Sequence, residues 1–365
     1  MTVRRPSLSR RGSTTQPHVG AHTDAFEISL FPESLFYHTR FRRPLSYKHL
    51  IFLFYFPFGA ALCLFRVLFI LLSTVLLFDL SRLLRLEHQF FCFWCFVLGV
   101  RVSIKNKELL NDDPFKIIVA NHICEADALA LALAFDQKLS LIVPKFYSKF
   151  VLSRKFVTSY FNPLYIQPKC SRHILHDAVH EHLASNSTSP IALFPEGALT
   201  NGKVSLLSFN KFMFSLNVPI KPVGIKVQNA FHSVINTDHL TSPVSINILW
   251  LLVLPFVQWE LTILPTQEAE EGEDSFGFSK RVQKLVARAV DLDSSDFHVK
   301  QKYAMVYKAL KLRDMSFVPS KQNVSKVERF GFAFGLFHNF KATVSTRIRR
   351  KSGGYLSRKI LKRRL

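Results

Sequence analysis

A run of 31 apolar-rich residues, positions 50–80, constrains this chain more than any other feature of its sequence. It reads LIFLFYFPFGAALCLFRVLFILLSTVLLFDL, and only Pro57, Gly59, Arg66 and Asp79 interrupt it. About 20 helical residues cross the hydrocarbon core of a bilayer, so the run is too long for one simple span and too short for two. We therefore predict a membrane hairpin that is broken at Pro57 and Gly59, because these residue types disrupt helices. Core helices of a soluble protein are the alternative.

Basic residues flank this run on both sides, at positions 40–48 and at Arg82 and Arg85. Because positively charged flanks stay on the cytosolic side of a membrane, both ends of the hairpin are predicted to face the cytosol. Arg66 is expected to extend its long side chain toward the lipid headgroups. A second apolar run, residues 90–100, is too short to span a bilayer and is predicted to be interfacial or packed on the folded domain.

The net charge of +22 points to an anionic partner. The basic residues gather at the two ends of the chain and beside the apolar runs, as expected for a protein on anionic lipid. Zinc-ligand spacing, an RNA-binding signature and a basic-region helix are all missing from the sequence, so nucleic acid is not predicted as a partner.

Five cysteines lie scattered among apolar residues, which does not indicate a disulfide framework. Cys92 and Cys95 form a C-x-x-C pair within FFCFWCF. Redox and metal sites need accessible polar surroundings, so these thiols are interpreted as buried or lipid-facing. Such a composition fits a reducing compartment that faces the cytosol.

The chain divides into four predicted regions. These are a disordered basic N-terminal region (1–49), the membrane hairpin with its interfacial segment (50–100), a folded domain (101–290) and a basic, partly disordered C-terminal region (291–365). Short apolar strands alternate with helices in the folded domain, which predicts an α/β fold with a mostly parallel sheet flanked by helices. The expected strands are 117–120, 139–143, 163–166, 191–194 and 220–227, and the expected helices are 126–135, 145–157, 174–184 and 278–290. A broken apolar stretch, 245–265, is interpreted as a surface helix or loop followed by a strand, or as a buried core element.

The first chemical signal is the stretch IIVANHICEAD, in which a short apolar strand leads to His122 and Asp127. An imidazole titrates near neutrality and can take a proton from a hydroxyl, and a carboxylate on its second nitrogen would fix its tautomer. Five helical positions turn through about 140°, so His122 must precede the helix if the two side chains are to meet. Glu125 is a local alternative for the carboxylate.

The second signal is IALFPEGALTNGK, residues 191–203, where another apolar strand ends in a Pro-Glu-Gly turn. Glu196, the backbone amides near Gly197 and the ammonium group of Lys203 would suit a hydroxylated substrate. Further along, VPIKPV at 218–223 carries two prolines, which predicts that this strand enters the sheet at an edge.

The motifs NH-x-x-x-x-D, FPEG and VPIKPV, in this order, resemble the glycerolipid acyltransferase family. The run FPEGALTNGKVSLLSF is similar to its lysophospholipid branch. The hydrophobic hairpin, the TNG and LLSF runs, and LPFVQWE are similar to the ancient ubiquitous protein family, whose members are monotopic proteins of the endoplasmic reticulum and lipid droplets. The resemblance covers about residues 50–290.

This resemblance implies a function and a set of site residues. His122 would be the general base that deprotonates an acceptor hydroxyl for attack on an acyl-CoA thioester, with Asp127 as its charge partner. Acyl-CoA would be a co-substrate, and no cofactor or metal is implied. The expected location is the endoplasmic reticulum membrane and the lipid droplet, with the domain in the cytosol and membrane lipids as partners. The implied substrate-binding residues are Asn121, Glu196, Gly197, Thr200, Asn201 and Lys203.

Two departures from the family pattern concern the acceptor. Where phosphate-binding members carry a block like F-I-D-R, this chain has YIQP at 165–168, with Lys169 and Arg172 as substitute cations. Leu199 stands where many relatives have arginine. These differences disfavour glycerol 3-phosphate and lysophosphatidic acid, and they favour a lysophospholipid or an absence of turnover.

The alternative function is therefore a catalytically weak or inactive scaffold that acts in lipid-droplet regulation and protein degradation, with ubiquitin-pathway partners. A ubiquitin-binding helical region is not recognisable after Asp291. Instead, the aromatic run 330–340 and a basic tail predict a peripheral membrane anchor, with a disordered soluble tail as the alternative.

Overall fold

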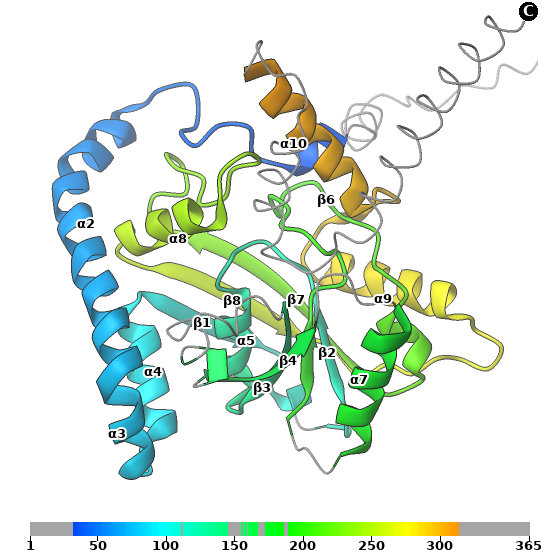
Figure 1. Ribbon diagram of the computed structural model, residues 1–365. Helices are drawn as coiled ribbons and strands as arrows, with labels where there is room; N and C mark the ends of the chain where they lie inside the picture. Colours follow the sequence, from blue (N-terminus) through cyan, green and yellow to red (C-terminus); the bar gives the residue numbers. More distant parts are fainter. Residues whose placement is uncertain are drawn as a thin grey trace, which may run out of the picture.

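A seven-stranded sheet forms the centre of the domain (Figure 1). The protein is described by a computed structural model that covers residues 32–110, 112–144, 155, 157, 158, 160–166, 172–185 and 189–313. The strand order is β1-β8-β7-β2-β5-β3-β4, and every neighbouring pair is parallel except β7 and β8. The strands are β1 (Val100–Lys105), β2 (Ile117–Ala120), β3 (Leu139–Pro144), β4 (Phe161–Ile166), β5 (Ile191–Leu193), β7 (Ile220–Asn229) and β8 (Val257–Ile263).

Strand β2 runs through the middle of the sheet and is buried on both faces. Ile118 and Ala120 belong to one hydrophobic cluster and Ile117 and Val119 to another. Helix α5 (Asp127–Phe135) packs in the first cluster, whereas α7 (Arg172–Ala184) and α9 (Ser275–Ala289) pack in the second. A strand covered on both sides must be apolar throughout, which is why IIVA forms it. The predicted mostly parallel sheet flanked by helices is confirmed.

The predicted edge position of VPIKPV is wrong, because β7 lies between β8 and β2. Pro222 is tolerated there because the β7–β8 ladder begins one residue later, at Val223 opposite Ile263. Its missing N–H therefore removes no bond to β8. The apolar stretch 245–265 forms α8 (Val244–Val253) followed by β8, as a helix and then a strand. Strand β1 and the small sheet of β6 (Ser205–Leu206) and β9 (Asp293–Ser294) were not predicted.

The apolar run at 50–80 lies within one continuous helix. Helix α2 (Tyr47–Leu72) continues through the π-helical turn η2 (Ser73–Leu77) into α3 (Phe78–Leu83), and of the described residues only this 37-residue stretch is long and apolar enough to cross a membrane. The predicted break at Pro57 and Gly59 is therefore wrong. The chain reverses after α3 instead, and α4 (Glu87–Val97) returns beside it (Figure 1).

Gly59 is a point of close approach. A Cβ atom at this position would lie 2.9 Å from the carbonyl oxygen of Val253, at the end of α8. Phe52, one heptad earlier on the same side of α2, packs edge-on against Phe231 with 5.0 Å between ring centroids. The packing of α2 on the domain thus offsets the hydrogen bond that Pro57 cannot donate, and the helix continues.

Arg66 lies in the middle of α2 and is only 3% exposed. Its guanidinium donates hydrogen bonds to the carbonyl oxygens of Val97 (2.8 Å), Leu252 (3.0 Å), Leu254 and Pro255 (2.9 Å). These oxygens belong to the ends of α4 and α8, where helices leave carbonyl groups unpaired. The predicted reach of Arg66 toward lipid headgroups is therefore wrong, since its five N–H donors are better satisfied inside the protein.

Replacing Arg66 with methionine is expected to destabilise the domain by about 3 kcal/mol or more, because buried carbonyl groups would lose a charged donor. Thermal unfolding of the detergent-solubilised protein measures this loss. The matched control is Lys48→Met, which removes an exposed cation near the start of the same helix. Equal melting temperatures for the two variants would contradict the structural role of Arg66.

Both ends of the described chain pack on the domain. Residues 32–43, here called the N-terminal strap, bury Leu35 and Phe36, and α10 (Val299–Arg313) contacts the strap at η1 (Pro32–Leu35). The predicted disorder is thus wrong for residues 32–49, and the folded domain extends past residue 290 to 313. Residues 1–31, most of the helix predicted at 145–157 and the anchor predicted at 330–340 lie outside the described residues.

Candidate active site

His122 and Asp127 meet where β2 ends and α5 begins. His122 Nδ1 lies 3.0 Å from Asp127 Oδ2, and the two side chains are 3% and 0% exposed. His122 precedes the helix, and Asp127 is its first residue, so the turn between them closes the five-residue separation. The carboxylate also lies at the helix N-terminus, where the backbone dipole favours a negative charge. Glu125 does not take this place.

Three other donors hold the Asp127 carboxylate. Oδ2 accepts the backbone N–H groups of Ile123 (2.8 Å) and Cys124 (2.9 Å). Oδ1 accepts Trp259 Nε1–H at 2.8 Å, from the buried face of β8. A carboxylate with this many donors has its orientation fixed, and it fixes in turn the orientation and tautomer of the imidazole. Sequence analysis noted Trp259 only as part of a family pattern and missed this contact.

The FPEG turn packs directly against His122. The backbone N–H of His122 donates to Glu196 Oε1 at 2.8 Å, and the ring of Phe194 stacks on the imidazole with 4.2 Å between centroids. Glu196 Oε2 accepts the backbone N–H of Leu207 at 2.8 Å. The three sequence-distant pieces, 117–127, 191–203 and β7, thus form one site at the carboxyl ends of parallel strands, where α/β folds place their active groups.

Glu196 is buried, and its burial raises the pKa of this carboxyl group to about 8. The two backbone hydrogen bonds, from Leu207 and His122, oppose that shift. Gly197 completes the turn by donating its N–H to the carbonyl oxygen of Phe194 at 3.0 Å, with a φ of +70° that favours glycine. Both residues therefore set the position of the His122 loop, and their predicted contact with substrate stays a prediction.

The other predicted substrate-binding residues also have backbone partners. Asn121 bridges to β7, donating to the carbonyl oxygen of Ile225 at 2.9 Å and accepting its N–H at 2.6 Å. Thr200 donates its N–H to the carbonyl oxygen of His122 at 2.9 Å. Asn201 donates to the strap, at the carbonyl oxygens of Ser34 and Leu35.

Lys203 is exposed, with Nζ 5.5 Å from the centroid of the Tyr37 ring. Desolvation, with the nearby Arg42 cation second, lowers the pKa of its ammonium group. The structure thus places Asn121 and Thr200 beside His122, and Asn201 and Lys203 against the strap. Substrate contact by all four stays a prediction.

A second group of polar side chains surrounds Glu125, two residues before Asp127. Asn247 donates to Asp238 Oδ1 at 2.7 Å and lies 3.5 Å from Glu125 Oε1, and Arg40 of the strap donates to Asn247 Oδ1 at 2.6 Å. Glu125 Oε2 is buried and has no hydrogen-bond partner among the described residues. Burial, with the Asp238 charge second, raises the pKa of Glu125 to about 8.

Replacing Glu125 with glutamine is expected to stabilise the protein increasingly as the pH rises from about 5 to 9. The folded pKa lies above the ordinary value of 4.5, so folded Glu125 keeps a proton that the unfolded chain releases, and stability falls as the pH rises through 8. Glutamine removes this loss, which is on the order of a few kcal/mol at pH 9. Thermal melts across this pH range, with the exposed Glu271→Gln as control, test it. A gap between variant and wild type that does not change with pH would contradict the assignment.

The N-terminal strap and α10 pack together over the FPEG loop, and His122 itself is 2% exposed. Lys302 on α10 donates to the carbonyl oxygen of Leu199 at 2.6 Å, with Nζ 5.0 Å from the Phe36 ring centroid of the strap. A cation on α10 thus contacts the backbone of the loop that follows FPEG. Of the substitutes considered from sequence, Arg172 begins α7, and Lys169 lies outside the described residues.

Comparison with known proteins shows which family this chain resembles. The acyltransferase family model matches residues 101–226. The lipid droplet-regulating VLDL assembly factor AUP1 of Xenopus laevis is 32% identical over 256 residues, which are 67% of this chain and 58% of that protein. Human AUP1 is 29% identical over 198 residues, 53% of this chain and 44% of that protein. A lysophosphatidylcholine acyltransferase of Drosophila melanogaster is 23% identical over 234 residues, 62% of this chain and 42% of that protein.

Similarity to a solved structure is weaker. The lysophosphatidic acid acyltransferase PlsC of Thermotoga maritima matches with a TM-score of 0.41 and 21% identity, over 66% of this chain and 94% of that one. The chain spans about half the length of the curated relatives it matches. By these comparisons the chain resembles the acyltransferase family, and AUP1 proteins are among the relatives to which it is similar.

Proposed function

We propose that this protein transfers an acyl group from acyl-CoA to a hydroxyl of a lysophospholipid or related glycerolipid. The observation that carries the proposal is the 3.0 Å pairing of His122 Nδ1 with a fully buried, hydrogen-bonded Asp127. With the proton on Nδ1, the Nε2 lone pair is the base. It takes the acceptor proton as the hydroxyl oxygen attacks the thioester carbonyl carbon, the carbon–sulfur bond breaks, and the imidazolium returns the proton to the CoA thiolate. The scheme uses acyl-CoA as co-substrate and needs no metal ion.

Support for a lysophospholipid acceptor comes from the loop after FPEG. Leu199 has an uncharged side chain and is 5% exposed, and the cation that contacts its carbonyl oxygen is Lys302. A single lysine is a compact point charge and lacks the two-pronged geometry by which arginine binds a phosphate monoester. A phosphodiester headgroup, with its smaller charge, suits this site better.

The proposal is tested with the purified full chain in phosphatidylcholine vesicles. Release of CoA from oleoyl-CoA should rise when lysophosphatidylcholine is added and should not rise with additional diacyl phosphatidylcholine, which has no free hydroxyl. A panel of lysophospholipids then ranks the acceptors. CoA release that is independent of every acceptor would overturn the proposal.

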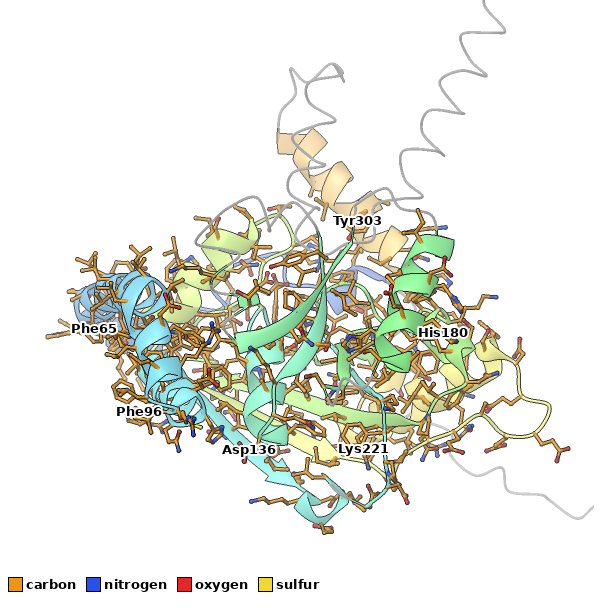
Figure 2. The ribbon with its side chains drawn as sticks, turned by 60° about the horizontal axis from the view of Figure 1, so that its bottom comes forward. Phe65, Phe96, Asp136, His180, Lys221 and Tyr303 are labelled. Atoms are coloured by element: carbon orange, nitrogen blue, oxygen red, sulfur yellow. The ribbon has the colours of Figure 1, made fainter. Side chains whose placement is uncertain are left out.

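We also propose that α2 lies in the plane of an endoplasmic reticulum or lipid-droplet surface, with the domain in the cytosol. Arg66 fixes the middle of the helix to the domain, so a perpendicular span would draw the domain into the hydrocarbon. The residues directed away from the domain are large and exposed (Figure 2). This outer apolar face consists of Leu53, Phe54, Phe58, Leu64, Phe65 and Leu68 on α2, Phe93 and Phe96 on α4, and Ile246, Ile248 and Leu249 on α8.

Replacing Phe54, Phe58 and Phe65 together with serine is expected to reduce the lipid-bound fraction of the protein severalfold. Each aromatic side chain that is buried in lipid contributes about 1.5 to 3 kcal/mol to the free energy of binding. Flotation of the full chain with phosphatidylcholine vesicles measures it. The control is Phe276→Ser, an aromatic on α9 across the sheet that is also exposed, at 51%. Unchanged flotation of the triple variant would exclude this face as the docking surface.

A scaffold is the second candidate function, and the burial of His122 favours it. The strap and α10 pack over the FPEG loop, and His122 is almost fully buried. AUP1 proteins are named for lipid-droplet regulation, and a scaffold of that kind would bind lipid and ubiquitin-pathway proteins without turnover. Lipid-droplet number in cells that express His122→Ala separates the two: it would change for an enzyme and stay the same for a scaffold.

A further inference from the structure

Outside the His122 site, two reactive side chains of α4 line up with a carboxylate at the end of α5. Cys92 Sγ lies 3.4 Å from His88 Nε2, and His88 Nδ1 lies 2.9 Å from Asp136 Oδ1. His88 and Cys92 are one helical turn apart on α4, which places both side chains on one face. Asp136 is the C-cap residue of α5, and its backbone is in the left-handed conformation. A thiol, an imidazole and a carboxylate thus stand in one line.

The order of these groups matches that of an activated nucleophile. When Nδ1–H is donated to Asp136, the lone pair of Nε2 is directed to the thiol, and the imidazole can accept its proton. Desolvation, with the Asp136 charge second, raises the pKa of Cys92, so the thiol stays protonated at neutral pH and needs such a base. The described residues include no group of three or more His, Cys, Asp or Glu side chains that could hold a metal ion.

The surroundings of Cys92 suit a long acyl chain. On the same helix, Phe93 is 54% exposed and Phe96 is 70% exposed, and both belong to the outer apolar face, where Figure 2 labels Phe96. Cysteines on helices at a lipid surface are the usual sites of S-acylation, because the chain attached there enters the lipid directly. Cys95, three residues along, is 1% exposed in the core and provides a natural comparison.

We propose that Cys92 is an S-acylation site at which His88 and Asp136 activate the thiol toward a long-chain acyl-CoA. The Cys92 sulfur attacks the thioester carbonyl carbon while His88 takes the thiol proton. The bond between that carbon and the CoA sulfur breaks, and His88 returns the proton to the CoA thiolate. One thioester replaces another, so no oxidant, reductant or energy source is required. The attached chain would hold α4 at the lipid surface, since each buried methylene contributes about 0.8 kcal/mol.

The test uses the purified full chain in phosphatidylcholine vesicles with alkyne-tagged palmitoyl-CoA and no other protein. We expect a hydroxylamine-labile label on the tryptic peptide that contains Cys92, lost in Cys92→Ala. His88→Gln is expected to lower the initial labelling rate about 10²-fold, as for loss of a general base. Asp136→Asn is expected to lower it less, because this carboxylate is exposed. Cys95→Ala is the matched control and should keep the wild-type rate.

Two results would overturn the proposal. One is a label spread over several cysteines at a rate that His88→Gln does not change, which is ordinary thiol reactivity. The other is labelling of Cys92 only after cell membranes are added, which would mean that a separate transferase does the chemistry. Because no lysophospholipid is added, failure here leaves the His122 proposal unaffected, and flotation of each variant verifies that it still docks on lipid.

Discussion

Acyl transfer by His122→Ala is expected to be slower than wild type by about 10² to 10⁴-fold, the usual contribution of a positioned general base. The substitution removes the imidazole and leaves the loop in place, because the contacts of residue 122 with Glu196 and Thr200 are made by backbone atoms. Folding should therefore be retained, although the stacking on Phe194 and the hydrogen bond to Asp127 are lost. The initial rate of CoA release with lysophosphatidylcholine measures the effect, and circular dichroism verifies the fold.

The control for this variant is His180→Ala. His180 is an exposed histidine on α7 (Figure 2). It should keep the wild-type rate. If His122→Ala and His180→Ala were equally active, the base would be another group or the observed turnover would come from a contaminant, and the enzyme proposal would lose its central residue.

The centre of the fold could be predicted from sequence because local and tertiary signals agree there. Residues 117–120 are apolar without alternation, which only a strand covered on both faces requires, and β2 has these bounds. The His122–Asp127 pairing was also accessible, since helix geometry alone places His122 before α5. In both cases the residues that determine the structure are close neighbours in the sequence.

The hairpin could not be predicted correctly, because its geometry depends on distant residues. Pro57 and Gly59 are helix breakers by propensity, yet Gly59 lets α2 approach Val253 and the helix continues. In the sequence Arg66 interrupts an apolar run, and its hydrogen bonds to carbonyl oxygens at the ends of α4 and α8 are visible only in the structure. Gly59 and Arg66 each have a partner more than 30 positions away, which periodicity does not reveal.

The same limit explains the contacts that sequence analysis missed around the site. Trp259 lies 132 residues from Asp127, and its indole N–H has no sequence spacing that marks it. One signal was present: an indole is a donor only, so a tryptophan in a buried strand must find an acceptor. Lys302 and the strap come from regions whose composition predicted disorder.

Asp127→Asn is expected to reduce acyl transfer by about 10³ to 10⁴-fold, because an amide in place of the carboxylate disfavours the His122 tautomer with the proton on Nδ1. The amide NH₂ would replace one oxygen and face the donors there, either the N–H groups of Ile123 and Cys124 at Oδ2 or that of Trp259 at Oδ1. We therefore expect a lower melting temperature, and the rate must be measured well below it.

Trp259→Phe separates orientation from charge. It removes one donor to Oδ1 and leaves the Oδ2 contacts with His122, Ile123 and Cys124 intact, so the dyad should remain but with a less fixed carboxylate. A loss of about tenfold in kcat is expected, from one hydrogen bond to a charged group. Trp250→Phe on α8 is the matched control and should leave kcat unchanged. If Trp259→Phe and Asp127→Asn were both as active as wild type, Asp127 would only cap α5, and His122 would act without a partner or not at all.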